Sequence, residues 1–217
     1  LIIVLIEKQV IAKSPKGIFL IGFGSASSIH RQNPNNTNDQ FEFVGSENWE
    51  NEASGLELHL LVPTNIISFG LGVASGTVNA KSEYTETTYN YYTGYRTITY
   101  KSNLRITSSS SDFSFVFSSN DDKFFLQIGQ SLGGTTNIEE LRLLNVDYNK
   151  YFDYKSDKTE SFFINLGLSG KGEYKDMYVV FGSRFWDVSV KQYLNDQHTN
   201  TYSAKYSLGS VGIGTNY

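Results

Sequence analysis

The sequence contains no cysteine and only three prolines among its 217 residues. Without cysteine the chain can form neither a disulfide framework nor a thiolate metal site, and it has no thiol nucleophile. The formal net charge of −4 argues against a nucleic-acid partner, because such proteins carry a concentrated basic surface. No apolar run approaches the roughly 18 residues of a membrane-spanning helix. These absences exclude several common classes of protein.

Aromatic residues and glycine are abundant instead. The chain has 15 Tyr, 15 Phe and 19 Gly residues, which is a strand-and-turn composition rather than a helical one. Because an evenly patterned all-β chain of this length is often a single unit, we expect one domain in residues 16–217.

Large apolar residues alternate with glycine or other small residues in several segments. The clearest is residues 67–74, with the sequence Ile-Ser-Phe-Gly-Leu-Gly-Val-Ala. A soluble sheet presents a polar face to water, where charged residues are favourable and glycine is a cost. In a closed barrel within a bilayer, the apolar face contacts hydrocarbon and the small polar face lines a narrow lumen. The pattern therefore predicts an all-β protein, a closed antiparallel transmembrane β-barrel.

Eight segments show this alternation, and we expect each to be a strand. They lie near residues 17–27, 55–62, 66–78, 112–118, 123–132, 160–169, 177–188 and 202–217. None of the positions expected to face lipid is Lys, Arg, Asp or Glu, and a charge there costs about 2–4 kcal/mol near the membrane midplane. The expected lipid-facing set is Phe19, Ile21, Phe23, Leu56, Leu58, Leu60, Val62, Ile67, Phe69, Leu71, Val73, Phe113, Phe115, Phe117, Phe124, Leu126, Ile128, Phe162, Ile164, Leu166, Leu168, Met177, Val179, Phe181, Val211, Ile213, Thr215 and Tyr217.

Short and long connections alternate between these segments. The short ones are residues 63–65, 120–122 and 170–176, and the long ones are 28–54, 79–111, 133–159 and 189–201. This arrangement places both chain ends on the short-turn side, as in bacterial outer-membrane barrels with periplasmic turns and extracellular loops.

One stretch leaves the strand number open. Residues 97–106 alternate in the phase opposite to Phe113. We expect the fourth strand to begin near Tyr95, to change phase through a β-bulge in residues 108–111, and to pair with an extension of the third strand to about Tyr89. The alternative is a ten-stranded barrel with a turn inside the serine run.

The first 15 residues are either an export-signal remnant or an N-terminal tail. Leu1–Ile6 is apolar and residues 10–12 resemble the small-residue end of a signal peptide, whereas Glu7 and Lys8 interrupt the apolar run.

The end of the sequence carries a more specific motif. Ser210, Gly212, Thr215 and Tyr217 match a pattern that resembles the C-terminal assembly signal of bacterial outer-membrane proteins, with Thr215 the weakest match. Together with the eight-strand layout, residues 16–217 resemble the small outer-membrane barrel superfamily that includes the transmembrane domain of outer membrane protein A and the X- and W-type proteins. The resemblance implies location in the bacterial outer membrane and insertion by the outer-membrane assembly machinery. It also implies contact with outer-membrane lipids, including lipopolysaccharide.

Several polar residues fall on the expected lumen face. Glu57, His59 and Arg184 share the inward phase, and Gln127, Asn165 and Trp186 could extend the same set. The interior of an eight-stranded barrel is filled by side chains, and charges buried there need partners. We therefore interpret these residues as a buried polar network, with no catalytic, metal or cofactor role.

Two other histidines are candidates for catalysis. His198 lies near Ser203, and His30 lies near Ser27 and Ser28. Small outer-membrane barrels include lipid A deacylases and palmitoyltransferases, but the deacylase pattern has a serine two residues after the histidine, where this chain has Asn200. A lipid-modifying enzyme is thus an alternative hypothesis.

The long connections are rich in aromatic residues. Tyr89, Tyr91, Tyr92, Tyr95 and Trp49 are candidates for contact with a surface ligand of unknown identity, since tyrosine provides rigid amphipathic contact area. The competing interpretation is an aromatic girdle and strand extension. In the third long connection, residues 137–144 are expected to form a short helix capped by Asn137, with Glu140 reaching back.

The sequence thus predicts an outer-membrane barrel with a mostly filled lumen and a structural or surface-interaction role. A narrow, porin-like channel for small solutes is the main alternative. A soluble, lipocalin-like carrier would instead require the apolar faces to point inward.

Overall fold

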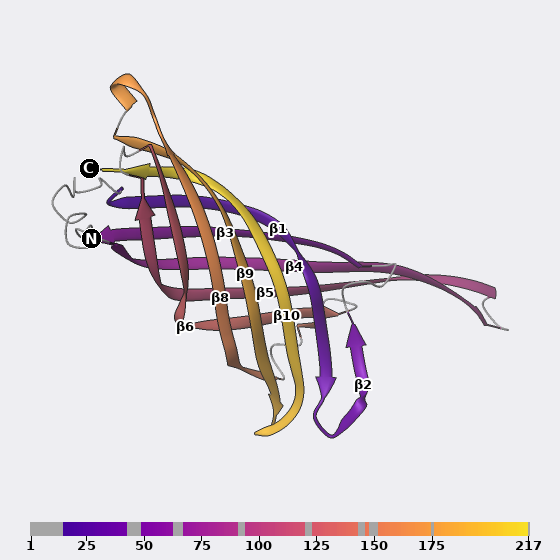
Figure 1. Ribbon diagram of the computed structural model, residues 1–217. Helices are drawn as coiled ribbons and strands as arrows, with labels where there is room; N and C mark the ends of the chain where they lie inside the picture. The colour runs from indigo at the N-terminus through magenta and orange to yellow at the C-terminus, as the bar shows by residue number, and fades with distance from the viewer. Residues whose placement is uncertain are drawn as a thin grey trace.

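The computed structural model describes residues 15–42, 49–62, 67–90, 94–119, 123–142, 146–147, 152–174 and 176–216. Eight strands close into an antiparallel ring in the order β1-β3-β4-β5-β6-β8-β9-β10, and β10 pairs back to β1 (Figure 1). Strands β2 and β7 lie outside the ring and pair with β1 and β6. The strands are β1 Gly17–Asn33, β2 Asn36–Glu42, β3 Trp49–Val62, β4 Ser68–Asn90, β5 Gly94–Ser118, β6 Phe124–Arg142, β7 Val146–Asp147, β8 Asp153–Ser169, β9 Met177–Leu194 and β10 Gln197–Thr215.

The predicted eight-stranded closed barrel is confirmed, and the ten-stranded alternative is wrong. The ring closes through a ladder that runs from Gly17↔Thr215 to Gln32↔Thr201. Its first pair lies at the end where β3, β5 and β8 finish and β4, β6 and β9 begin (Figure 1). In the described part of the chain, no helix is long and apolar enough to cross a membrane.

The apolar faces point outward and form a belt around the wall. Phe19 is 42% exposed and Phe23 is 67% exposed, and large apolar residues on all eight strands of the ring are exposed in the same way. Most of these positions are ones that the alternation predicted, although the exposed Leu132 and Phe185 were not among them. Because the apolar faces point outward, the lipocalin-like alternative is wrong. Tyr217 lies outside the described residues.

Most strands continue far beyond the belt, so the long connections are shorter than predicted. In this upper part the polarity of the two faces reverses: Leu104 and Ile106 on β5 are buried, whereas Arg105 is exposed. Leu104, Ile106 and buried Ser114 all lie on the inner face of β5 and are separated by even numbers of residues. The strand therefore keeps one alternation throughout, and the predicted phase change in β5 is wrong. The phase can stay constant because the outer face meets water above the bilayer while the inner face meets an apolar core.

A β-bulge does lie beside the serine run, but on the neighbouring strand. Ser111 pairs with Gly133 and Asp112 with Ser131, which leaves Leu132 of β6 as the extra residue. The predicted start of the long strand near Tyr95 is correct, since β4 and β5 pair from Ser68↔Val116 up to Asn90↔Gly94. Figure 1 shows this hairpin projecting away from the ring.

The expected helix is also wrong for residues 137–142, which belong to β6, whereas residues 143 and 144 lie outside the described residues. Asn137 lies in β6 and pairs with Thr107 of β5, and Ile138 is buried in the upper apolar core. Cross-strand pairing and burial of Ile138 thus outweigh the local capping pattern.

Two seams divide the wall above the belt. The β6–β8 ladder ends at Gln130↔Phe162 and the β1–β3 ladder at Gly24↔Ala53, although all four strands continue. Side chains bridge both seams: Ser161 N donates to Ser131 Oγ at 2.8 Å, and Ala26 N donates to Asn51 Oδ1 at 2.7 Å. The upper barrel therefore consists of two sheets that face each other across the apolar core.

The interior is layered along the barrel axis. At the short-turn end lies a lower apolar cluster, which consists of Ile18, Leu20, Leu61, Val116, Phe125, Tyr178 and Val180. A polar layer lies above it, followed by the larger upper apolar core, which includes Trp186, Val188, Tyr202 and Tyr206. Glycines make room for the rings, because a Cβ at Gly167 would collide with Phe125 and a Cβ at Gly129 would collide with Phe163.

A charge in the belt tests the lipid-facing assignment. Leu166→Arg places a guanidinium near the middle of the exposed apolar row of β8 and should lower the free energy of unfolding by about 2–4 kcal/mol. The measurement is urea unfolding in lipid vesicles. Thr135→Arg, on the exposed outer face above the belt, is the control and should change stability by less than about 0.5 kcal/mol. Equal effects of the two changes would contradict the assignment.

Candidate functional site

The middle of the lumen contains an ionic cluster built around Arg184 of β9. Its Nη2 donates to Glu57 Oε2 at 2.8 Å and to Asp112 Oδ2 at 2.7 Å. Its Nη1 donates to Ser161 Oγ at 2.7 Å. The three charged side chains are almost completely inaccessible to solvent, so each charge depends on the others for its stability.

Neighbouring side chains hold this cluster in place. His59 Nε2 donates to Glu57 Oε2 at 3.2 Å, and Ser110 Oγ donates to Asp112 Oδ1 at 2.7 Å. The Arg184 Cζ atom lies 4.4 Å from the centroid of the Phe163 ring and 5.4 Å from that of Trp186, within the range of cation–π attraction. The structure thus brings Glu57, His59, Arg184 and Trp186 together, as the shared inward phase suggested.

Gln127 and Asn165 form a second polar group at the same level of the barrel. Asn165 Nδ2 donates to Gln127 Oε1, and Gln127 Nε2 donates to Ser114 Oγ, both at 2.9 Å. All three side chains are buried, and the chain of bonds pairs both polar atoms of the Gln127 amide and the Asn165 Nδ2 donor, which would otherwise be costly to bury.

Sequence reasoning missed Asp112, which is the second carboxylate of the ionic cluster. A signal for it was present, since Asp112 directly precedes the outward Phe113 and alternation therefore points it inward. Ser110 and Ser161 were missed for a different reason, because nothing in an isolated serine distinguishes a ligand of Arg184 from an ordinary small residue.

The other predicted residues lie at different places. Ser210 is buried on the lumen face of β10, and Thr215 pairs with Gly17 at the end of the ring. A Cβ at Gly212 would collide with the Phe19 carbonyl oxygen, so β10 needs glycine where it packs against β1. Tyr95 is 80% exposed near the tip of the β4–β5 hairpin. The backbones of Trp49 and Tyr89 lie in β3 and β4, whereas their side chains, together with Tyr91 and Tyr92, lie outside the described residues.

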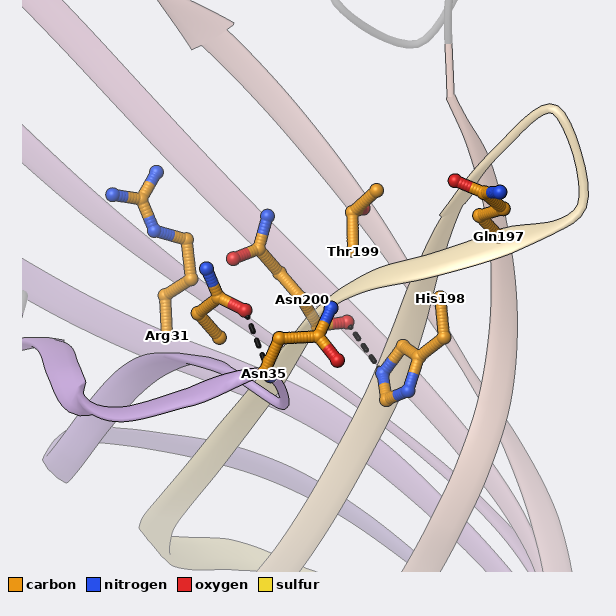
Figure 2. Close-up of a pocket in the computed structure, with 7 residues that line it drawn as sticks. Arg31, Asn35, Gln197, His198, Thr199 and Asn200 are labelled. Atoms are coloured by element: carbon orange, nitrogen blue, oxygen red, sulfur yellow. Dashed lines mark hydrogen bonds between the residues drawn. The ribbon is translucent and has the colours of Figure 1, made fainter.

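A polar cleft of about 730 Å³ lies at the mouth of the barrel, where the β1–β2 turn meets the β9–β10 hairpin (Figure 2). Arg31 and Asn200 follow the lumen phase of the buried Ile29 and Tyr202. The cleft therefore caps the upper apolar core. Seven residues line it: Arg31, Asn33, Asn35, Gln197, His198, Thr199 and Asn200.

His198 is part of this cleft, and its Nε2 atom makes two short polar contacts. The Nε2 atom lies 3.1 Å from the Asn200 carbonyl oxygen and 3.0 Å from Thr201 Oγ1. A carbonyl oxygen only accepts, so Nε2 carries the proton and donates to it. In this arrangement Nε2 is not a base for the Thr201 hydroxyl. Ser203 lies opposite His30 in the β1–β10 ladder.

No group of three or more His, Cys, Asp or Glu residues suitable for a metal ion occurs in the described part of the chain. In the ionic cluster, the two carboxylates share the Arg184 guanidinium.

No family model matches the chain, and no curated protein matches it. Solved structures with a similar overall arrangement include the outer membrane protease OmpT of Escherichia coli, at 10% identity, with 93% of this chain and 97% of that chain covered and a TM-score of 0.48. OprG of Pseudomonas aeruginosa is 12% identical, with coverage of 94% and 98% and a TM-score of 0.45. Ail of Yersinia pestis, solved with the heparin analogue sucrose octasulfate, is 10% identical, with coverage of 91% and 97% and a TM-score of 0.39.

At such identities a likeness concerns the fold alone, and here the ring and its belt define that fold directly. The chain has the fold of a small outer-membrane β-barrel protein. Within this barrel, the ionic cluster and the mouth cleft are the two places where polar side chains converge.

Removal of one partner tests whether the ionic cluster holds the barrel together. Arg184→Ala leaves two buried carboxylates unpaired and should lower the free energy of unfolding by about 3–5 kcal/mol. The combined change Glu57→Gln, Asp112→Asn and Arg184→Met removes all three charges and should recover more than half of that loss. Both values come from urea unfolding in lipid vesicles.

The matched control is Arg105→Ala, because Arg105 is exposed and its ion pair with Glu139 spans 3.8 Å. We expect this exposed pair to contribute less than about 1 kcal/mol. If Arg184→Ala were as stable as Arg105→Ala, the ionic cluster would not be a structural element.

Proposed function

We propose that this barrel resides in the bacterial outer membrane with a closed lumen and acts at the cell surface, in a structural or interaction role. The observation that carries the proposal is the contrast between its two ends. One end has short connections, whereas the other carries strands far beyond the belt, up to Asn90 on β4 and from Gly94 on β5. Among the described residues, the second end offers the larger surface to partners.

The charges on the outer wall support a boundary with lipid headgroups just above the belt. Lys158 Nζ lies 2.9 Å from Asp187 Oδ2 and 3.2 Å from Glu160 Oε2, and Lys205 Nζ lies 3.9 Å from Asp187. On the same outer wall, these charged residues lie just above the exposed Phe162, which belongs to the apolar belt. This level suits the charged headgroups of the outer leaflet, including those of lipopolysaccharide.

Higher on the same wall, Lys191 Nζ donates to Asp157 Oδ1 at 2.6 Å. This hydrogen bond lowers the pKa of the Asp157 carboxyl and raises the pKa of Lys191. Both groups therefore stay charged at neutral pH, as expected for a surface that extends into the aqueous phase.

Insertion would depend on the outer-membrane assembly machinery, with Ser210, Gly212, Thr215 and Tyr217 as its recognition motif. In support, β10 carries Ser210, Gly212 and Thr215 of this motif and closes the ring against β1. We assign no catalytic role, because His198 Nε2 donates its proton to a backbone carbonyl rather than accepting one.

Cysteine labelling in intact cells tests the proposed orientation, and the absence of native cysteine gives a clean background. Asn35→Cys lies in the exposed turn between β1 and β2, and Glu173→Cys lies in the 3₁₀ turn Gly172–Tyr174 between β8 and β9. A membrane-impermeant maleimide should label Asn35→Cys in intact cells. Glu173→Cys should react only after the outer membrane is permeabilised. The reverse pattern would overturn the orientation.

The layered interior supports a closed lumen rather than a channel. The lower apolar cluster, the ionic cluster and the upper apolar core succeed one another along the axis. The purified barrel should therefore show no steady ionic conductance in planar lipid bilayers. Stable single-channel currents from the folded, heat-modifiable protein would instead favour the alternative of a narrow channel.

A further inference from the structure

The outer wall of the barrel carries a hollow at the top of the belt, where the β6–β8 ladder ends. Its volume is about 800 Å³, and residues of β6, β8, β9, β10 and β1 line it. Three large apolar side chains in this lining are exposed: Leu132 at 67%, Phe162 at 49% and Phe185 at 51%. The hollow is thus continuous with the lipid-facing belt, and these side chains suit contact with an acyl chain.

The hollow lies beside the β-bulge of β6. Gln130 and Phe162 form the last pair of the β6–β8 ladder, and Leu132 is the extra residue just above it. Ser161 N donates to Ser131 Oγ at 2.8 Å, so the two strands remain joined at this level. The hollow is therefore a feature of the outer wall, and a ligand would reach it from the bilayer.

The end of the ladder also limits how high hydrocarbon can reach on this wall. An unpaired backbone N–H or C=O group is costly in hydrocarbon. Above the pair Gln130↔Phe162, β6 and β8 no longer pair with each other. The boundary between acyl chains and headgroups therefore lies at this level, and a lipid in the hollow would have its headgroup just above Phe162.

A row of charged side chains lies directly above the aromatic side chains of the hollow. Glu160, Asp187 and Lys205 are paired across β8, β9 and β10. On β8 and β9 this row is two residues beyond the pair Phe162↔Phe185. Rows on one face of a sheet are about 7 Å apart along the strands, so a headgroup meets the charges as soon as its chain leaves the aromatic residues.

The charges around this row are balanced in sign. Lys158 Nζ lies 2.9 Å from Asp187 Oδ2 and 3.2 Å from Glu160 Oε2. Together with Lys205, the group contains two ammoniums and two carboxylates. Net charge therefore favours neither an anionic nor a cationic lipid, and the arrangement is complementary to a headgroup that carries both signs.

The two ends of the row are its most exposed members. The side chain of Glu160 is 69% exposed and that of Lys205 is 65% exposed. Lys205 Nζ lies 3.9 Å from Asp187 Oδ2, beyond hydrogen-bond distance, and a carboxylate such as that of Glu160 can accept from more than one donor. Their backbones are two strands apart, about 10 Å, so one headgroup can contact both side chains.

We propose that the hollow binds one lipid whose headgroup carries a phosphate and a primary ammonium, as in phosphatidylethanolamine. One acyl chain lies against Leu132, Phe162 and Phe185, the phosphate contacts Lys205, and the ammonium donates to Glu160. A choline headgroup has no N–H to donate, and a glycerol headgroup has no cation. The inference adds a specific lipid to the headgroup contact described above, and it rests on the proposed function only for the level of the headgroup boundary.

The test uses the purified full chain in detergent micelles, with native mass spectrometry to measure the lipid retained on the folded barrel. Phosphatidylethanolamine, phosphatidylcholine and phosphatidylglycerol with identical acyl chains are titrated separately. We expect one phosphatidylethanolamine per chain, bound about three- to fivefold more tightly than the other two, as one partly exposed ionic contact would provide. Glycerophosphoethanolamine, which has no acyl chain, should not be retained.

Three outcomes would overturn the proposal. Equal retention of the three lipids would mean unselective contact with the belt, and a preference for phosphatidylglycerol would reduce the charged row to an anion site. A dimer without bound lipid would show that a second copy of the chain covers the hollow. None of these outcomes depends on orientation in the cell, so they are distinct from a failure of the cysteine-labelling experiment.

Variants then assign the contacts, and all of them change exposed residues. Glu160→Gln should remove the preference for phosphatidylethanolamine over phosphatidylcholine, whereas Lys205→Gln and Leu132→Ser should each weaken all three lipids. Glu139→Gln and Arg105→Gln, in the exposed ion pair between β5 and β6, are the matched controls and should change none. Heat-dependent gel mobility verifies that each variant is folded. Unchanged lipid retention in both Glu160→Gln and Leu132→Ser would place the site elsewhere and overturn the assignment.

Discussion

Closure of the sheet between β1 and β10 is the constraint on which the rest of this structure depends. In hydrocarbon an unpaired backbone N–H or C=O costs several kcal/mol, so a sheet in the bilayer must leave no open edge. The ladder from Gly17↔Thr215 upward removes that edge. Closure with eight strands also makes the lumen narrow, and a narrow lumen decides which side chains fit inside.

The lumen composition follows from this narrowness. Large inward rings such as Phe125 and Phe163 fit because a glycine is paired with each of them on the neighbouring strand of the β6–β8 ladder. The same restriction of space leaves little room for water around Arg184, Glu57 and Asp112, so the three charges must satisfy one another directly. The narrow lumen thus explains both the glycines on the inner face and the Arg184 guanidinium that two carboxylates share.

Above the belt the outer face of the barrel meets water instead of lipid. Each strand keeps the same alternation there, but its outer face becomes polar and its inner face becomes apolar. Outward positions such as Arg105 meet water, and inward positions such as Leu104 meet the upper apolar core. The two seams lie in this region, where water can satisfy the backbone groups that the ladders leave unpaired. The mouth cleft lies at the top of the same region, so a change of solvent along the strands separates the membrane-spanning part of the barrel from the part that extends into water.

Local alternation by itself determined the fold class, the eight membrane strands and the lipid-facing residues, because each of these depends only on which side chains share a strand face with a period of two. It also indicated the inward phase of Glu57, His59 and Arg184. Only the tertiary structure decided how far the strands extend, that residues 137–142 belong to a strand, and that Asp112 shares Arg184 with Glu57. The mouth cleft likewise exists only because β1 pairs with β10, which brings Arg31 and Asn200, 169 positions apart in the chain, to one site. Such features arise from contacts between distant segments, and periodicity within a single segment carries no information about them.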